Sequence, residues 1–172
     1  TTNLTSNALL YLARHPDKRQ ELIDNPSLLP LANEEFLRYF TPLHALARTV
    51  KEDVTIDGWD LKKDQRVLLA YASGNRDPEV FDKPDEVILN RTPNPHFSFG
   101  AGMHRCLGSF VARHMFQAMV TEVLTRLPDY KIEEDKIAQY PKIGYLNGWI
   151  RVPATFTPGK KVGAEMPKST HQ

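Results

Sequence analysis

The clearest chemical signal in the chain is a glycine-bearing segment around its only cysteine. Residues 99–108, the cysteine loop, read Phe-Gly-Ala-Gly-Met-His-Arg-Cys-Leu-Gly. Gly100 and Gly102 permit left-handed backbone conformations and the close approach of a flat ligand. Gly108 removes a side chain close to Cys106, where a helix start would favour a negatively charged sulfur. Such a sulfur is suited to be a soft metal ligand or a nucleophile.

Two plainer interpretations compete for this cysteine. A free cysteine is most often a buried structural residue with no chemistry of its own. His96 and His114 lie near Cys106 in the sequence and suggest a zinc site, although the spacing lacks the second close pair of ligands that structural zinc sites use. The residues alone leave both interpretations open.

Helices and a long irregular stretch must hold the cysteine loop in place. Three helices separated by prolines are expected over residues 1–14, 17–24 and 30–40. The strongest helix is expected over residues 107–127, so that Cys106 stands at its first turn. Its apolar residues spread over more than one face, which predicts that it is largely buried. Residues 73–98 are rich in proline, and an irregular stretch of this length is typical of a functional loop.

Short segments with β character complete the chain. Strands are expected over residues 44–50, 54–56, 66–72, 130–132, 143–146 and 149–156. The pair Asn147-Gly148 is typical of a type I′ hairpin turn. The predicted fold class is therefore mainly α with small β-sheets, in one unit over residues 1–157 with a flexible tail over residues 158–172.

Composition excludes several classes of protein. The 172 residues carry 22 Lys and Arg against 21 Asp and Glu, so a net charge of +1 gives no bulk attraction to nucleic acid or to an anionic membrane. A single cysteine forms no intramolecular disulfide and supports no site that needs four cysteine ligands. No apolar run approaches the ~20 residues of a membrane span, and no signal peptide opens the chain. We therefore expect a cytoplasmic protein with neither a membrane nor a nucleic acid as partner.

The cysteine loop resembles the haem-binding loop of the cytochrome P-450 family, whose pattern is Phe-Gly-x-Gly-x-His/Arg-x-Cys-x-Gly. Glu35 and Arg38 match the Glu-x-x-Arg of that family, and residues 75–78 are similar to the stretch that precedes the loop in bacterial members. The likeness runs in order from residue 1 to about Phe156. It implies the C-terminal part of the family's fold: the end of the I helix, the J and K helices, the meander, the cysteine loop, the L helix and the terminal strands.

The resemblance also implies roles for individual residues. Cys106 would be the catalytic thiolate and the metal ligand of a haem b iron, a ligation that favours O–O cleavage. The other residues implied to bind the cofactor are His104, Arg48, Phe99, Gly100, Gly102 and Gly108. Those implied to line an apolar substrate pocket are Leu43, Leu46 and Leu146. Those implied to form a buried structural network are Glu35, Arg38 and Arg91.

The implied function is a haem-thiolate monooxygenase that inserts one oxygen atom from O2 into an apolar organic substrate, with electrons from a ferredoxin-type redox partner. The alternatives are an H2O2-driven peroxygenase and a haem-binding fragment without turnover of its own. The family's acid–threonine pair would precede residue 1, so the N-terminal portion of the same enzyme is an implied partner. Without that portion, apolar faces of the first and last long helices would be exposed. Arg105 and Arg113 would face either an acidic redox partner or solvent.

Overall fold

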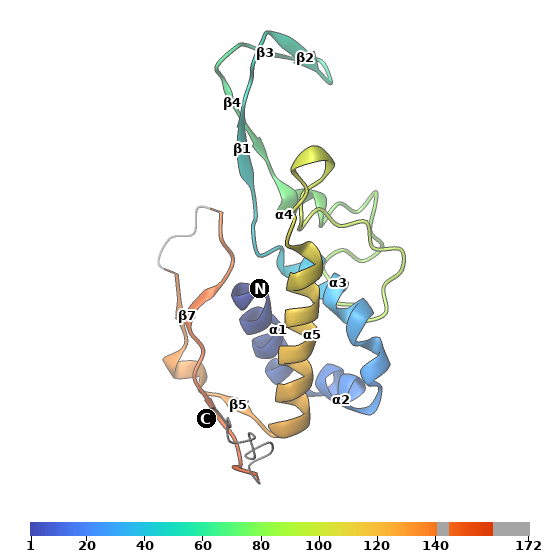
Figure 1. Cartoon of the computed structure of the whole chain (residues 1–172), viewed down its shortest axis with the longest axis vertical. Coiled ribbons are helices and arrows are strands. Elements are labelled where there is room, and N and C mark those ends of the chain that lie inside the picture. The colour runs from blue at the N-terminus through green and yellow to red at the C-terminus, as the bar shows by residue number, and fades with distance from the viewer. Residues whose placement is uncertain (141–144, 160–172) are drawn as a thin grey trace, which may run out of the picture.

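The computed structural model describes residues 1–140 and 145–159, and it is mainly helical (Figure 1). The α-helices of this part are α1 (Thr2–Arg14), α2 (Pro16–Asp24), α3 (Leu29–Phe40), α4 (Tyr71–Gly74) and α5 (Ser109–Arg126). Short 3₁₀ turns lie at Pro26–Leu28, Gly102–His104 and Glu134–Lys136. Helix α5 packs against α1, α2 and α3, so these four helices form the body of the structure.

Prolines and one left-handed residue set the ends of the first helices. His15 and Asn25 each precede a proline and have φ of −126° and −131°, so α1 and α2 end there. Thr41 ends α3 with φ of 40°, and its backbone N–H donates to the Leu37 carbonyl. The three helices predicted at the start of the chain are confirmed within a few residues.

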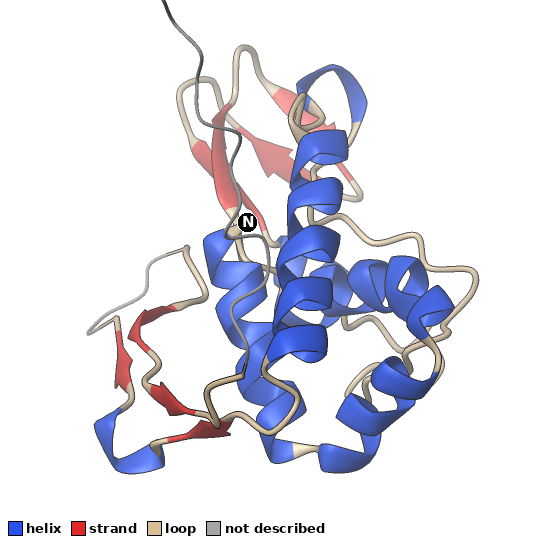
Figure 2. Cartoon of the chain, turned by 60° about the horizontal axis from the view of Figure 1, so that its bottom comes forward, coloured by secondary structure: helices blue, strands red, loops and turns tan. Residues whose placement is uncertain are grey.

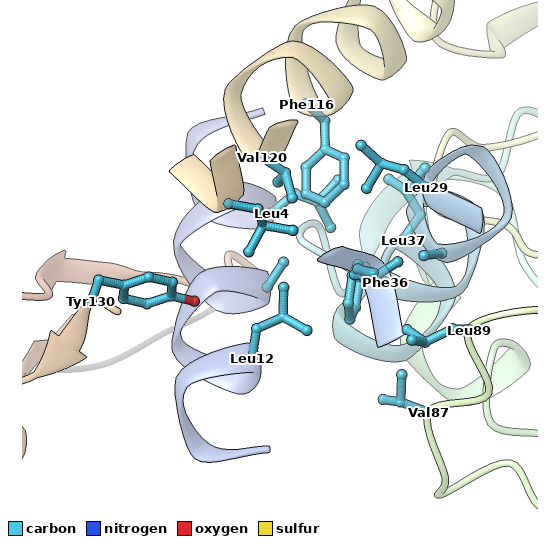
Figure 3. Close-up of a cluster of buried hydrophobic side chains, with 14 residues drawn as sticks. Leu4, Leu12, Leu29, Phe36, Leu37, Val87, Leu89, Phe116, Val120 and Tyr130 are labelled. Atoms are coloured by element: carbon cyan, nitrogen blue, oxygen red, sulfur yellow. The ribbon is translucent and has the colours of Figure 1, made fainter. Parts of the chain in front are cut away.

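The core lies where α1, α3 and α5 meet (Figure 3). Leu12 of α1, Phe36 of α3 and Phe116 of α5 are each fully buried. The rings of Phe36 and Phe116 pack with their centroids 6.1 Å apart. Val87 and Leu89 of the 73–98 stretch are buried on the far side of α3, so this stretch is anchored although most of it lacks regular structure.

In residues 1–140 and 145–159, four two-stranded antiparallel sheets lie outside the helical body (Figure 2). Their paired strands are β1 (Leu46–Thr49) with β4 (Arg66–Leu69), β2 (Val54–Ile56) with β3 (Trp59–Leu61), β5 (Lys131–Ile132) with β8 (Ala154–Thr155), and β6 (Ala138–Gln139) with β7 (Trp149–Arg151). Asp57 and Gly58 join β2 to β3 with positive φ at both residues, as a type I′ turn requires. Strands β1 to β4 project away from the helices (Figure 1).

Several predictions about the strands are wrong. Residues 71 and 72, predicted to end a strand, instead begin α4, and β3 and β6 were not predicted. The 149–156 segment is split into β7 and β8, which pair with different strands. Asn147 and Gly148 form no type I′ turn, because neither has positive φ. Residues 143 and 144, and the tail from residue 160 onward, lie outside the described residues.

The helix predicted over residues 107–127 also needs correction. Helix α5 begins at Ser109, so Leu107 lies before it and is 98% exposed. The prediction that this helix is largely buried is wrong: Phe110 is 70% exposed, and the buried residues of α5 are Ser109, Phe116, Val120 and Leu124. The expected apolar exposure therefore occurs on α5, while the apolar residues of α1 are largely buried. No helix among the described residues is both long enough and apolar enough to cross a membrane.

Candidate functional site

The cysteine loop is folded back on itself. Gly100 and Gly102 have φ of 69° and 66°, which confirms the left-handed conformations predicted for them. The Cys106 N–H donates to the Phe99 carbonyl over 2.8 Å and closes the loop. The prediction that Cys106 stands in the first turn of the helix is wrong: it lies three residues before α5, and its carbonyl accepts the N–H of Ser109 over 3.3 Å.

A cleft of about 440 Å³ opens beside this loop. The cysteine loop contributes Phe99, Gly100, His104, Cys106 and Gly108 to its lining. The remaining lining residues are mostly apolar: Thr1, Leu4, Leu37, Pro42, Leu43, Leu46, Tyr71, Ser98 and Ala112. The thiol of Cys106 is exposed. The fold thus brings together seven of the predicted site residues, five from the loop and the two leucines at positions 43 and 46.

Three predicted site residues lie elsewhere. Arg48 is exposed on β1, where its guanidinium donates to the Ala47 carbonyl over 3.0 Å. Gly102 lines a separate cavity of about 380 Å³ and not the cleft. Leu146 forms a backbone bridge with Leu43 but does not line the cleft.

The segment around Leu146 is held by the end of α3. The Asn147 N–H donates to the Pro42 carbonyl over 3.0 Å, and its side chain amide donates to the Phe40 carbonyl. Trp149 donates to Asn7 Oδ1 over 2.6 Å and lines a third cavity, of about 560 Å³, with Tyr11 and other aromatic residues. These long-range hydrogen bonds carry the side chain of Trp149 away from the cleft.

The acid network predicted on α3 is fully assembled and buried. Arg38 donates to both carboxylate oxygens of Glu35 over 2.8 Å, and Arg91 donates to both over 3.0 and 3.1 Å. The N–H of Ile88 and the side chain of Asn94 complete the shell around the carboxylate. Burial alone would raise the pKa of Glu35, but these donors outweigh it and lower the pKa below its ordinary value.

Arg38 and Arg91 also tie the network to the 73–98 stretch. Arg38 donates to the carbonyls of Asn75, Pro84 and Glu86 over 2.8 to 2.9 Å. Arg91 donates to the carbonyl of Asp82 over 2.7 Å. Because backbone carbonyls of an irregular segment find their partners in these guanidinium groups, the network orders the chain that leads into the cysteine loop.

Asn75 provides a second attachment between the 73–98 stretch and α3. In the sequence it was noted only as part of residues 75–78, which are similar to a stretch of the family. Its Oδ1 accepts the N–H of Phe97 over 2.6 Å, and its Nδ2 donates to the hydroxyls of Thr41 and Ser98. The Ser98 hydroxyl in turn donates to the Leu37 carbonyl over 2.6 Å. The residues just before the cysteine loop are therefore fixed to the end of α3.

Some residues of the cleft were missed by the sequence reasoning. Tyr71 and Ser98 line the cleft and neither was selected. Tyr71 falls in a segment that the sequence predicts to be a strand, and the one signal for Ser98 is its position directly before the loop. The zinc interpretation finds no support in the contacts: His96 hydrogen-bonds Glu34, and His114 hydrogen-bonds the Phe110 carbonyl.

The lining of the cleft fits a haem group by its chemistry. In the family that the cysteine loop resembles, a single thiolate sulfur is the protein ligand of the iron, and Cys106 is an exposed free cysteine that lines the cleft. A Cβ placed on Gly108 would lie 4.0 Å from the Cys106 sulfur, so the glycine leaves that side of the sulfur open. Leucines form much of the remaining wall, which suits a flat apolar macrocycle.

Comparisons with known proteins agree with this geometry. Residues 23–142 match the family model for Cytochrome P450. The chain is 38% identical to the biotin biosynthesis cytochrome P450 of Bacillus subtilis over 91% of this chain and 39% of the relative. It is 35% identical to the steroid C26-monooxygenase of Mycolicibacterium smegmatis over 94% of this chain and 40% of the relative.

Solved structures give the same result. The crystal structure of P450BioI in complex with an acyl carrier protein ligated to hexadec-9Z-enoic acid has a TM-score of 0.84 and 38% identity, over 90% of this chain and 40% of that one. Substrate-free CYP109E1 from Bacillus megaterium has a TM-score of 0.86 and 33% identity, over 91% of this chain and 41% of that one.

The chain therefore spans about two fifths of the length of the relatives it matches. Three kinds of observation point to the same family: the geometry of the cysteine loop and the Glu35 network, the family model matched over 120 residues, and the likeness to the solved structures. On this evidence the chain belongs to the cytochrome P450 family.

Proposed function

We propose that this chain forms the haem-thiolate part of a monooxygenase that inserts one oxygen atom from O2 into an apolar organic substrate. The observation that carries the proposal is the exposed thiol of Cys106 on a folded-back glycine loop, beside a cleft lined by leucines. Bound haem b would supply the oxygen-activating chemistry, which thiolate ligation promotes.

Individual residues of the chain would hold the cofactor and the substrate. Cys106 would ligate the iron through its sulfur, and His104 would donate a charge-assisted hydrogen bond to a haem propionate. Phe99 would shield the sulfur from water. Leu43 and Leu46 would exclude water from the substrate and bind its apolar surface.

The remaining assignments extend the same proposal. Arg48 would bind a propionate if its exposed side chain turned from the Ala47 carbonyl, and Leu146 would reach the substrate through its contact with Leu43. The rest of the enzyme would complete the pocket and deliver protons, and a ferredoxin-type partner would deliver electrons. A cytoplasmic setting suits a free thiol that must stay reduced.

Two chemical classes of apolar substrate deserve testing first. One relative's structure carries a hexadecenoic acid on an acyl carrier protein, and CYP109E1 has been solved with corticosterone. Fatty acyl chains and steroids are both consistent with the leucine-lined wall. A spectral titration of the complete enzyme with long-chain fatty acids and with steroids would separate the two classes.

The decisive experiment is the CO spectrum of the reduced, haem-loaded protein. Thiolate ligation predicts a red-shifted Soret band, which Cys106→Ser should abolish. Met103→Leu is the matched control, because Met103 lies in the same loop and is 98% exposed. A wild-type protein whose reduced CO complex lacks the red-shifted band would refute the proposal. Turnover with H2O2 and without ferredoxin would identify a peroxygenase instead.

A further inference from the structure

Glu34 connects three parts of the structure and is not explained by the Glu35 network. It precedes Glu35 on α3, yet it bonds to a different set of residues. Arg113 of α5 donates to both Glu34 carboxylate oxygens over 2.7 Å. His96, three residues before the cysteine loop, hydrogen-bonds Glu34 Oε2 through Nε2 over 3.1 Å. One carboxylate therefore joins α3 to α5 and to the segment that leads into the loop.

The contacts continue from Arg113 to the cysteine. The guanidinium carbon of Arg113 lies 4.6 Å from the centroid of the Phe99 ring, a cation–π contact. The carbonyl of the same Phe99 accepts the Cys106 N–H over 2.8 Å. Glu34 is thus separated from the cysteine backbone by two intervening residues, each in direct contact with the next.

The geometry indicates that this cluster is rigid. His96 Nδ1 accepts the N–H of Ser98 over 3.2 Å, which leaves Nε2–H to donate to Glu34. The His96 side chain is 4% exposed, and those of Glu34 and Arg113 are 26% and 20% exposed. Bidentate arginine–carboxylate pairs fix orientation as well as distance. By contrast, Glu122 and Arg126 on α5 form an ion pair with both side chains more than half exposed.

We propose that Glu34 is a positioning residue for the cysteine loop. It holds the Arg113 guanidinium against the Phe99 ring, and the Phe99 carbonyl in turn holds the backbone N–H of Cys106. The two neighbouring carboxylates of α3 have different roles: Glu35 orders the 73–98 stretch, and Glu34 orders the cysteine loop. The inference rests on the proposed function only in the experiment that measures the CO band of the haem-loaded protein.

Hydrogen exchange of backbone amides tests the proposal in the haem-free protein. In Glu34→Gln we expect the amides of Gly100 and Cys106 to exchange at least about tenfold faster, because their hydrogen bonds open with the loop. Arg113→Lys keeps the charge but loses the flat bidentate pair, and it should give the same local increase. Glu122→Gln, the matched control on α5, should change these amides by less than about twofold. An unchanged rate, or an equal increase in β1 and β4, would overturn the proposal.

A second substitution separates positioning from general support. In a Phe99→Leu background, Glu34→Gln should produce no further increase in the Cys106 exchange rate, because the ring through which it acts is gone. An equal increase in both backgrounds would overturn the route through Phe99.

The haem-loaded protein offers an independent signal. Glu34→Gln should speed the loss of the red-shifted CO band about threefold or more, and Glu122→Gln should not; equal rates in the wild type and Glu34→Gln would count against the proposal. If the wild type shows no such band, the proposed function fails, while the exchange measurement still decides the role of Glu34.

Discussion

The two sides of α3 differ in how completely other residues of the chain bury and hydrogen-bond them. On one side, Glu35 and Arg38 are fully buried, and every donor and acceptor they use comes from the chain itself. On the other side, the cysteine loop borders an open cleft, where Met103 and Leu107 are each 98% exposed. The difference teaches that this part of the fold carries its own buried scaffold, whereas residues of the cysteine loop beside the cleft are left exposed.

The relatives are more than twice as long as this chain, and exposed apolar surface like that on the cysteine side is typical of an interaction surface. Substitutions on the scaffold side should therefore change the stability of the chain strongly. Substitutions of exposed residues on the cleft side should hardly change it.

The largest effect is expected from Glu35→Gln. It removes the only carboxylate between Arg38 and Arg91 in the described network, and leaves two largely buried cations without a counter-charge. Breaking a buried pair in this way costs about 3–5 kcal/mol, which is a large part of a typical stability. Urea unfolding followed by circular dichroism measures the loss.

Lys18→Gln is the matched control for this prediction. Lys18 and Glu21 form a partly exposed pair on α2, at 3.4 Å. Exposed pairs contribute less than about 1 kcal/mol. If the two substitutions shifted the urea midpoint equally, the buried network would not be the scaffold of this side.

Two phenylalanines on α5 sharpen the comparison because the helix runs from the open side to the closed one. Phe116→Ala removes a ring that is 0% exposed and should destabilise the chain by about 3–5 kcal/mol. Phe110→Ala removes a ring that is 70% exposed and should change stability by less than about 0.5 kcal/mol. A similar loss for both, measured by urea unfolding, would mean that the first turns of α5 are buried in solution.

The parts of the site that could be predicted from sequence depend on local signals. Glycine spacing predicted the left-handed turns at Gly100 and Gly102, and the Glu-x-x-Arg pattern, through the family resemblance, implied the network of Glu35 with Arg38. Prolines marked the ends of α1 and α2 for the same reason, because a proline restricts its neighbour whatever the rest of the fold does.

The features that sequence could not predict depend on long-range contacts. The apolar pattern of α5 continues through Leu107, so nothing local shows that the chain must first turn to bond Cys106 to Phe99. Asn147 and Gly148 match a hairpin turn, but hydrogen bonds to the end of α3 override that preference. Glu34 beside Glu35 resembles a solvated helix face until the fold brings Arg113 to it.

Substitutions of two buried asparagines should have smaller effects on stability, and in opposite directions. Asn75→Ala leaves the N–H of Phe97 without its acceptor and removes a hydrogen bond to each of two hydroxyls, which should cost about 1–3 kcal/mol. Asn33 is fully buried on α3, and neither of its side-chain polar atoms has a partner among the described residues. Asn33→Leu should therefore leave stability unchanged or raise it by about 1 kcal/mol. Urea midpoints that fell equally in both variants would show that Asn33 is hydrogen-bonded in solution.

The smallest effect concerns Glu34, which lies between the two sides. Burial raises its pKa, but hydrogen bonds from Arg113 and His96 outweigh burial and lower the pKa from 4.5 to about 2. A carboxylate with a depressed pKa in the folded state adds stability above its ordinary pKa, and that stability is lost as the pH falls toward 2. Glu34→Gln should therefore cost on the order of 1 kcal/mol at neutral pH and make the loss of stability between about pH 4.5 and 2 shallower than in the wild type. Urea midpoints measured across this range, with Glu122→Gln as the control for losing one carboxylate, test the sign. A slope that stayed as steep in Glu34→Gln would mean that the bond from Arg113 does not hold the two sides of α3 together in solution.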